Sequence, residues 1–206
     1  MSAPQLGLGC VKLGTATSER AEIRLIHQAI DMGFTVFDTA DVYGAGSSER
    51  VLGKAVRGRR DGLSVATKGG YVVRERAPWE QWLRRRAGAL PASVRPSDPR
   101  RRTGRSHDPL EPRSARQRPA GTQPRGGGGQ DFSADHLRSA VEGSLRRMGL
   151  EHIDVYQFHG ADRIDDDSMA MLIELREAGV IGSVGLGAEN YEAVRETMRT
   201  PDLAVV

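Results

Sequence analysis

The stretch that decides how this chain folds runs from Phe34 to Gly44 and reads FTVFDTADVYG. Its first four residues are apolar or β-branched and predict a strand, which stops at the carboxylate of Asp38. Tyr43 follows five residues later, next to a glycine. An acid and a phenol therefore lie beyond the C-terminal end of a strand, which is where parallel α/β proteins place their functional residues.

Two further predicted strands also end on an ionisable residue. The run LSVAT at residues 63–67 leads into Lys68, and the run IDVYQF at residues 153–158 leads into His159. The carboxyl ends of parallel strands meet at one edge of a sheet. We therefore expect four side chains to converge there: Asp38, Tyr43, Lys68 and His159.

Helical periodicity separates these predicted strands. Helices are predicted around residues 23–30, 51–56, 137–148 and 169–178, with Ser18 and Ser133 as candidate N-caps. Further strands are predicted at residues 6–10, 181–186 and 203–206. The strands read as continuously apolar and their connections are short, so we expect a parallel sheet covered by helices.

Short motifs surround the four ionisable residues in an order typical of one protein family. They read FDTADVYG at 37–44, SERVLG at 48–53, ATK at 66–68, SLRRMG at 144–149 and IDVYQFH at 153–159. Together they resemble the aldo-keto reductases over about two thirds of the chain, although each motif alone is weak. The DVYG form and the later ELREAGVI are most similar to the aldose dehydrogenase branch, which acts on sugars and small aldehydes.

The resemblance implies a (β/α)8 barrel, and the length of the chain implies that this barrel is incomplete. A full barrel typically needs about 250 residues, whereas this chain has 206. We expect about six of the eight strands, in two parts at residues 1–71 and 131–206. An open sheet of this kind exposes two edges, through which the protein could associate with itself.

The segment between these two parts, residues 72–130, differs in composition. It holds 14 arginines against five acidic residues, so the rest of the chain is acidic although the whole has a net charge of +3. Eight of the ten prolines lie between Pro78 and Pro124. We predict a disordered insertion after the third strand, either genuine or the product of an out-of-frame reading. Trp79 and Trp82, near its start, are candidates for lining a substrate pocket.

The resemblance also assigns a role to each of the four ionisable residues. It implies an NADP(H)-dependent oxidoreductase, with NAD(H) as the alternative cofactor, that interconverts an aldehyde, ketone or sugar with its alcohol or lactone. Tyr43 would donate a proton to the carbonyl oxygen, and Lys68, held by Asp38, would lower the pKa of Tyr43. His159 would orient the carbonyl. The substrate site would then comprise Tyr43, Trp79 and His159.

On the cofactor side, the resemblance points to Asp38, Gly187 and Asn190. The family usually carries a Ser-Asn pair after the fifth strand to hold the nicotinamide carboxamide, whereas this chain has Gly187-Ala188. The usual phosphate contacts belong to the part of the barrel that the sequence lacks. We therefore expect weak NADPH binding, and the alternative is a catalytically silent barrel fragment that binds a partner or a small ligand.

Composition weighs against other classes of protein. Cys10 is the single cysteine, no apolar run is long enough to span a membrane, and the start MSAPQ does not resemble a signal peptide, so we expect a cytoplasmic protein. The Arg-rich segment could bind nucleic acid, but it lacks aromatic residues for base stacking beyond Trp82. The acidic run at 165–167 precedes a predicted helix, and stabilising a helix N-terminus explains it better than a metal site.

Overall fold

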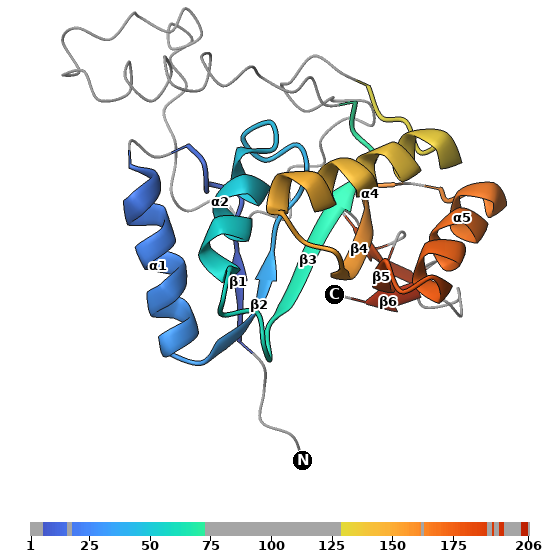
Figure 1. Ribbon diagram of the computed structural model, residues 1–206. Coiled ribbons are helices and arrows are strands. Elements are labelled where there is room, and N and C mark those ends of the chain that lie inside the picture. The colour runs from blue at the N-terminus through green and yellow to red at the C-terminus, as the bar shows by residue number, and fades with distance from the viewer. Residues whose placement is uncertain are drawn as a thin grey trace, which may run out of the picture.

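A sheet of six parallel strands runs through the computed structural model of the chain (Figure 1). The structure describes residues 6–15, 18–72, 129–161, 163–188, 191, 194–195 and 203–205. Within them the strands are β1 (Leu6–Gly9), β2 (Phe34–Asp38), β3 (Ser64–Gly69), β4 (Ile153–His159), β5 (Ile181–Gly187) and β6 (Leu203–Val205). The helices are α1 (Glu19–Asp31), α2 (Ser47–Val56), α4 (Ala134–Met148) and α5 (Asp166–Glu177).

The strands lie side by side in the order in which they occur in the chain, and every neighbouring pair is parallel. Helix α1 leads from β1 to β2, α2 from β2 to β3, α4 from β3 to β4 and α5 from β4 to β5. Figure 1 shows these helices following one another along the outside of the sheet, and consecutive helices pack against each other. This succession of strand and helix is that of a β/α barrel, and it confirms the predicted fold class.

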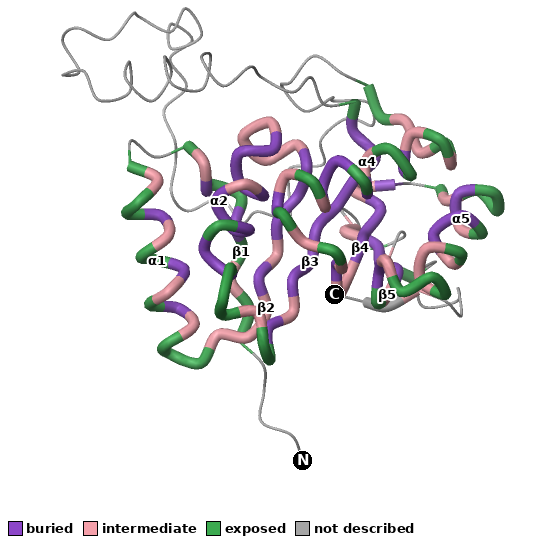
Figure 2. Tube along the Cα trace, viewed as in Figure 1, coloured by how far each residue is buried: buried purple, intermediate pink, exposed green. Residues whose placement is uncertain are grey.

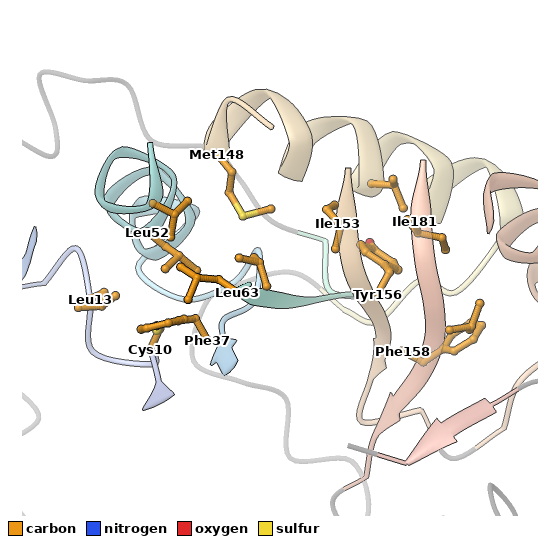
Figure 3. Close-up of a cluster of buried hydrophobic side chains, with 14 of the residues drawn as sticks. Cys10, Leu13, Phe37, Leu52, Leu63, Met148, Ile153, Tyr156, Phe158 and Ile181 are labelled. Atoms are coloured by element: carbon orange, nitrogen blue, oxygen red, sulfur yellow. The ribbon is translucent and has the colours of Figure 1, made fainter. Parts of the chain in front are cut away.

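The two faces of the sheet differ in chemistry, because side chains alternate between them along each strand. The outer face, toward the helices, carries large residues that are fully buried, some of which Figure 3 labels: Phe37, Val65, Tyr156, Phe158 and Val184. The inner face carries small and polar residues in neighbouring register positions: Gly9, Asp38, Ala66, Lys68, Gln157 and Gly185. The inner face thus carries branched residues such as Val36 and Val155 nearer the start of its strands, whereas polar side chains stand at the C-terminal end, where branched residues usually fill a barrel.

Helix α2 is the most enclosed of the helices. Eight of its ten residues are buried, and α1 and α4 pack on either side of it. In Figure 2 the buried colour accordingly extends through α2, whereas α1 and α5 alternate between buried and exposed positions. Contact between α2 and α4 is so close that a Cβ at Gly53 would lie 2.0 Å from the carbonyl oxygen of Met148. Only glycine therefore fits at position 53 without moving one of the two helices.

Short-range hydrogen bonds set the helix ends where the sequence predicts them. Ser18 caps α1 by accepting from the backbone N–H of Ala21, and Ser133 caps α4 by accepting from that of His136. Asp165 caps α5: its Oδ1 accepts from the backbone N–H of Ser168 at 2.8 Å, and this bond lowers the pKa of Asp165. The acidic run at 165–167 thus stabilises a helix N-terminus, as predicted.

A buried ion pair joins α2 to α4. Arg147 donates from Nε to Oε2 of Glu49, whose side chain has no exposed surface. The other carboxylate oxygen of Glu49 accepts from the hydroxyl of Thr67 on β3 at 2.7 Å. Arg147 also donates to the Ser144 hydroxyl at 3.2 Å. One carboxylate therefore ties two helices and the outer face of the sheet together, because each of its oxygens is satisfied by a different element.

The chain on either side of residues 73–128 is held together by the backbone. Tyr71 and Gln130 form an antiparallel bridge, in which Val72 N–H donates to the Gly129 carbonyl at 3.0 Å and Asp131 N–H donates to the Gly70 carbonyl at 2.8 Å. The predicted disordered insertion lies outside the described residues apart from its ends, and so do Trp79 and Trp82. Among the described helices, none is both long and apolar enough to cross a membrane.

Replacing Arg147 with methionine should lower the free energy of unfolding by about 3–5 kcal/mol, because Glu49 would remain buried without a cation. Urea denaturation measures the loss. The matched control is Arg146→Met: the side chain of Arg146 is 72% exposed and pairs with Glu142, one helical turn away, so its loss should change stability by about 0.5 kcal/mol or less. Equal effects of the two substitutions would show that the buried pair contributes nothing specific.

Candidate active site

The structure brings together the four ionisable residues that the sequence singles out. Asp38 is the last residue of β2, His159 is the last of β4, and Lys68 is the last but one of β3. Their strands pair in register, so all three side chains stand at the C-terminal edge of the inner face. Tyr43 reaches the same place from the loop between β2 and α2. The four therefore occupy the position in which β/α barrels carry their chemistry.

A series of tight turns places Tyr43. The backbone N–H of Asp41 donates to the Lys68 carbonyl at 3.1 Å, which lays the loop across the end of β3. Tyr43 N–H then donates to the Ala40 carbonyl at 3.1 Å. The chain turns back through Gly44, Ala45 and Gly46, all of which have positive φ. Glycine at two of these three positions lowers the strain of this tight turn, since left-handed backbone is strained for most other residues.

Lys68 and Asp38 form the charged centre of the site. Lys68 is 7% exposed, and its Nζ donates to both carboxylate oxygens of Asp38, at 2.6 Å each. The same ammonium group donates to the carbonyl oxygen of Thr39 at 2.8 Å. These acceptors compensate for the removal of the ammonium group from water.

Tyr43 is close both to this cation and to His159. The Nζ of Lys68 is 5.4 Å from the centroid of the Tyr43 ring. The His159 ring stands at 89° to that of Tyr43, with the centroids 5.7 Å apart. A nearby positive charge favours the ionised form of a phenol, so this arrangement suits a tyrosine that must give up its proton.

The His159 ring is held in its neutral form. Burial, and to a smaller extent the positive charge of Lys68, lower the pKa of His159 from 6.5 to about 4. Its Nδ1 is buried and has no hydrogen-bond partner among the described residues. At neutral pH the ring therefore acts as an uncharged hydrogen-bonding group.

Three residues in contact with the site are not identified by the sequence analysis: Gln157, Tyr71 and Gln130. Gln157, 2% exposed, donates from its amide to Oδ1 of Asp38 at 3.1 Å. Tyr71 meets the His159 ring edge to face, and Gln130 donates to the carbonyl oxygens of His159 and Gly160 at 3.2 Å each. The two-residue period of a strand could have revealed Gln157, since it stands two before His159 and therefore on the same face.

On the cofactor side, the structure describes only part of the predicted set. Gly187 ends β5 beside His159, its register partner on β4. A Cβ at position 187 would lie 3.1 Å from Cδ of Lys68 and 3.5 Å from Oε1 of Gln157. Glycine at this position adds no side chain of its own beside Lys68 and Gln157, so a flat ring could approach the backbone there. Asn190 and Trp79 lie outside the described residues.

Comparison with known proteins agrees with this geometry. The family model of the Aldo/keto reductase family matches residues 5–206, almost the whole chain. This protein belongs to that family. Its match to the family model runs through β2, β3 and β4 and so includes all four residues of the site.

Individual relatives are similar over about half of their own length. The chain is 26% identical to a D-threo-aldose 1-dehydrogenase from a Pseudomonas species, covering 100% of this chain and 56% of that protein. Among solved structures, the holo form of an aldo-keto reductase from Bacillus halodurans superposes with a TM-score of 0.66 at 25% identity, over 98% of this chain and 51% of that one. An aldo-keto reductase from Klebsiella pneumoniae in complex with NADPH gives a TM-score of 0.60 at 22% identity, over 97% and 51%.

A second buried acid lies close to the site, in the same loop as Tyr43. Asp41 is 3% exposed, and its Oδ1 has no partner among the described residues. Burial, reinforced by the negative charge of Glu49, raises the pKa of Asp41 from 3.8 to about 7. The folded protein therefore holds a proton on Asp41 between about pH 4 and 7, where the unfolded chain releases it, and this contribution to stability is lost as the pH rises.

Replacing Asp41 with asparagine should remove that loss. The advantage of the variant in free energy of unfolding should grow from pH 4 to pH 7 and level off above, reaching at most roughly 4 kcal/mol for a shift of this size. Urea denaturation at a series of pH values measures the difference in free energy of unfolding between the variant and the wild type. The lowered pKa of His159 also makes stability depend on pH, but this contribution cancels in the difference because both proteins retain His159. Asp61→Asn, at an exposed position, is the control and should give a flat difference.

Proposed function

We propose that this chain carries the reacting end of an NADP(H)-dependent oxidoreductase, which interconverts an aldehyde, ketone or sugar with its alcohol or lactone. The observation that carries the proposal is the placement of Tyr43 close both to the Lys68–Asp38 pair and to the neutral ring of His159. Membership of the aldo/keto reductase family supports it. The similarity to an aldose dehydrogenase favours a sugar or small aldehyde as substrate.

Tyr43 is the proton donor in this proposal. Reduction of a carbonyl places negative charge on its oxygen, and a phenol with a pKa of about 10 gives up its proton readily only if a cation stabilises the phenolate. Lys68 is that cation, and both carboxylate oxygens of Asp38 hold it in place. Gln157 supports the carboxylate from β4, so the pair is fixed from three neighbouring strands. In the oxidising direction Tyr43 takes the proton back.

His159 directs the carbonyl oxygen toward Tyr43. A neutral imidazole offers one N–H, and a proton on Nε2 leaves only an unpaired acceptor at the buried Nδ1. A charged ring would place a second N–H at Nδ1, where the described residues provide no acceptor. The neutral form can therefore donate to a substrate oxygen without burying an unsatisfied charge.

The described residues fit the reacting end of a nicotinamide cofactor. Gly187 leaves backbone, not side chain, next to Lys68 and Gln157, and with Asp38 it would border the nicotinamide ring. Such a cofactor supplies or accepts a hydride at the carbonyl carbon. NADP(H) is the preferred form because a related structure holds NADPH, and the altered Gly187-Ala188 position predicts looser binding of the carboxamide.

The chain spans about half the length of the relatives it matches, so whether it binds the nucleotide by itself is the first question to test. Nucleotide titration answers it directly. We expect NADPH to bind saturably to the purified 206-residue protein, with a change in nucleotide fluorescence, and NADH to bind more weakly. Absence of binding up to about 1 mM, equivalent to less than about 4 kcal/mol, would reject the function for this chain and favour a silent barrel fragment.

Tyr43→Phe should lower kcat for carbonyl reduction by about 10²–10⁴-fold, because it deletes the proton donor and little else. NADPH binding should be unchanged. Tyr156→Phe is the control for loss of a tyrosine hydroxyl: that hydroxyl is buried on the outer face of the sheet, away from the site, so the variant should leave kcat as it is. Steady-state kinetics with a small aldehyde measure both variants. An active Tyr43→Phe protein would remove Tyr43 from the mechanism.

A further inference from the structure

We propose that Tyr71 and Gln130 form a clamp that positions His159 for the carbonyl oxygen of the substrate. Neither residue is one of the four ionisable residues predicted from the sequence, and neither carries the reacting proton. The catalytic side of this inference rests on the proposed function, whereas the clamp itself is a property of the folded chain.

The Tyr71 part of the clamp acts on the imidazole ring. Tyr71 is 6% exposed, and its ring meets that of His159 at 83° with the centroids 4.9 Å apart. The nearly perpendicular Tyr43 ring makes a second edge contact, at 5.7 Å. Edge-to-face contacts of this kind are favoured by the ring quadrupoles and restrict the orientation of both partners. The imidazole is thus fixed by two aromatic rings from different loops.

The Gln130 part of the clamp acts on the backbone of His159. Its amide donates to the carbonyl oxygens of His159 and Gly160, at 3.2 Å each. Gly160 N–H in turn donates to the Gly187 carbonyl at 2.9 Å, which ties the same peptide to β5. The end of β4 is therefore fixed on both sides, where a strand terminus would otherwise be free to fray.

The two parts of the clamp are joined to each other by the backbone. Tyr71 and Gln130 are partners in the antiparallel bridge that follows β3, with backbone bonds on both sides of it. A side chain that orders the ring and one that orders the backbone thus share a single small piece of sheet. Loss of either contact should loosen the same residue, His159.

The clamp also keeps water away from His159. Among the described residues, the charged and titratable groups that face the ring are Tyr43 from the loop after β2, Lys68 from β3 and Tyr71 from beyond β3. None of these provides a negative charge to stabilise an imidazolium ion, and the nearby carboxylate of Asp38 is engaged by Lys68. Removal of Tyr71 would admit water, which favours the charged ring.

NMR of the histidine rings tests the clamp without any need for activity. The wild-type titration should show one histidine with a pKa of about 4, and His159→Gln assigns it by removing its signals. In Tyr71→Ala the pKa of His159 should rise toward about 6.5, and the ring-current shift from Tyr71 should disappear. Tyr71→Phe keeps the ring and should preserve both features. Tyr191→Ala, at a 69% exposed tyrosine, is the control for loss of a tyrosine and should change neither.

Kinetics then show whether the clamp serves the reaction. We expect kcat to fall at least tenfold in Tyr71→Ala with little change in KM, and to be retained in Tyr71→Phe. An unshifted His159 pKa in folded Tyr71→Ala would overturn the clamp whatever the activity. A shifted pKa in a protein that binds no NADPH would leave the clamp standing and reject the proposed function.

Gln130→Ala provides an independent test if Tyr71→Ala does not fold. Gln130 is exposed, so its replacement should be tolerated by the fold. We expect broader His159 signals and a fall in kcat, because the carbonyls of residues 159 and 160 lose their donor. Sharp, wild-type His159 signals together with wild-type kcat would overturn the proposal.

Discussion

The site depends on one requirement: the ammonium group of Lys68, which is removed from water, needs partners for its charge. Lys68 lies on the inner face of the sheet, where an unpaired cation would cost several kcal/mol. Its compensation comes from β2 and the residue after it: both carboxylate oxygens of Asp38 and the carbonyl oxygen of Thr39 accept hydrogen bonds from it. This arrangement requires β2 and β3 to stay in register, since a slip by one residue would turn Asp38 to the other face.

Strand β3 carries compensated polar groups on both of its faces. Thr67 points outward and donates to Glu49, which Arg147 neutralises, while Lys68, the next residue, points inward to Asp38. The outer network fixes α2, and α2 follows the loop that holds Tyr43. The packing of α2 on the outer face of the sheet therefore helps to position Tyr43 on the inner face. Glu49, 18 residues before Thr67, thus links β3 to the helix that follows the Tyr43 loop.

The sequence predicts those features that depend on local order along the chain. A carboxylate, an amine and an imidazole at strand ends must meet if the strands are parallel, so Asp38, Lys68 and His159 could be found from their positions alone. Ser18, Ser133 and Asp165 could be identified as caps for the same reason. Tyr71 and Gln130 could not be paired in this way, because a long stretch of chain separates them and only the antiparallel bridge reveals that they are neighbours. The shifted pKa of Asp41 likewise depends on burial that no motif records.

Because Tyr71 and Gln130 are bridged, the stability of the barrel should depend little on the length of the chain between them. Both ends of that segment are fixed to each other before they reach the sheet, by the bonds from Val72 to Gly129 and from Asp131 to Gly70. For a flexible connection, each doubling in length costs only about 0.6 kcal/mol of closure entropy. In evolution, insertions and deletions can therefore accumulate at this point while the register of β3 and β4 stays constant. It is equally a place where a foreign domain could be grafted beside the active site.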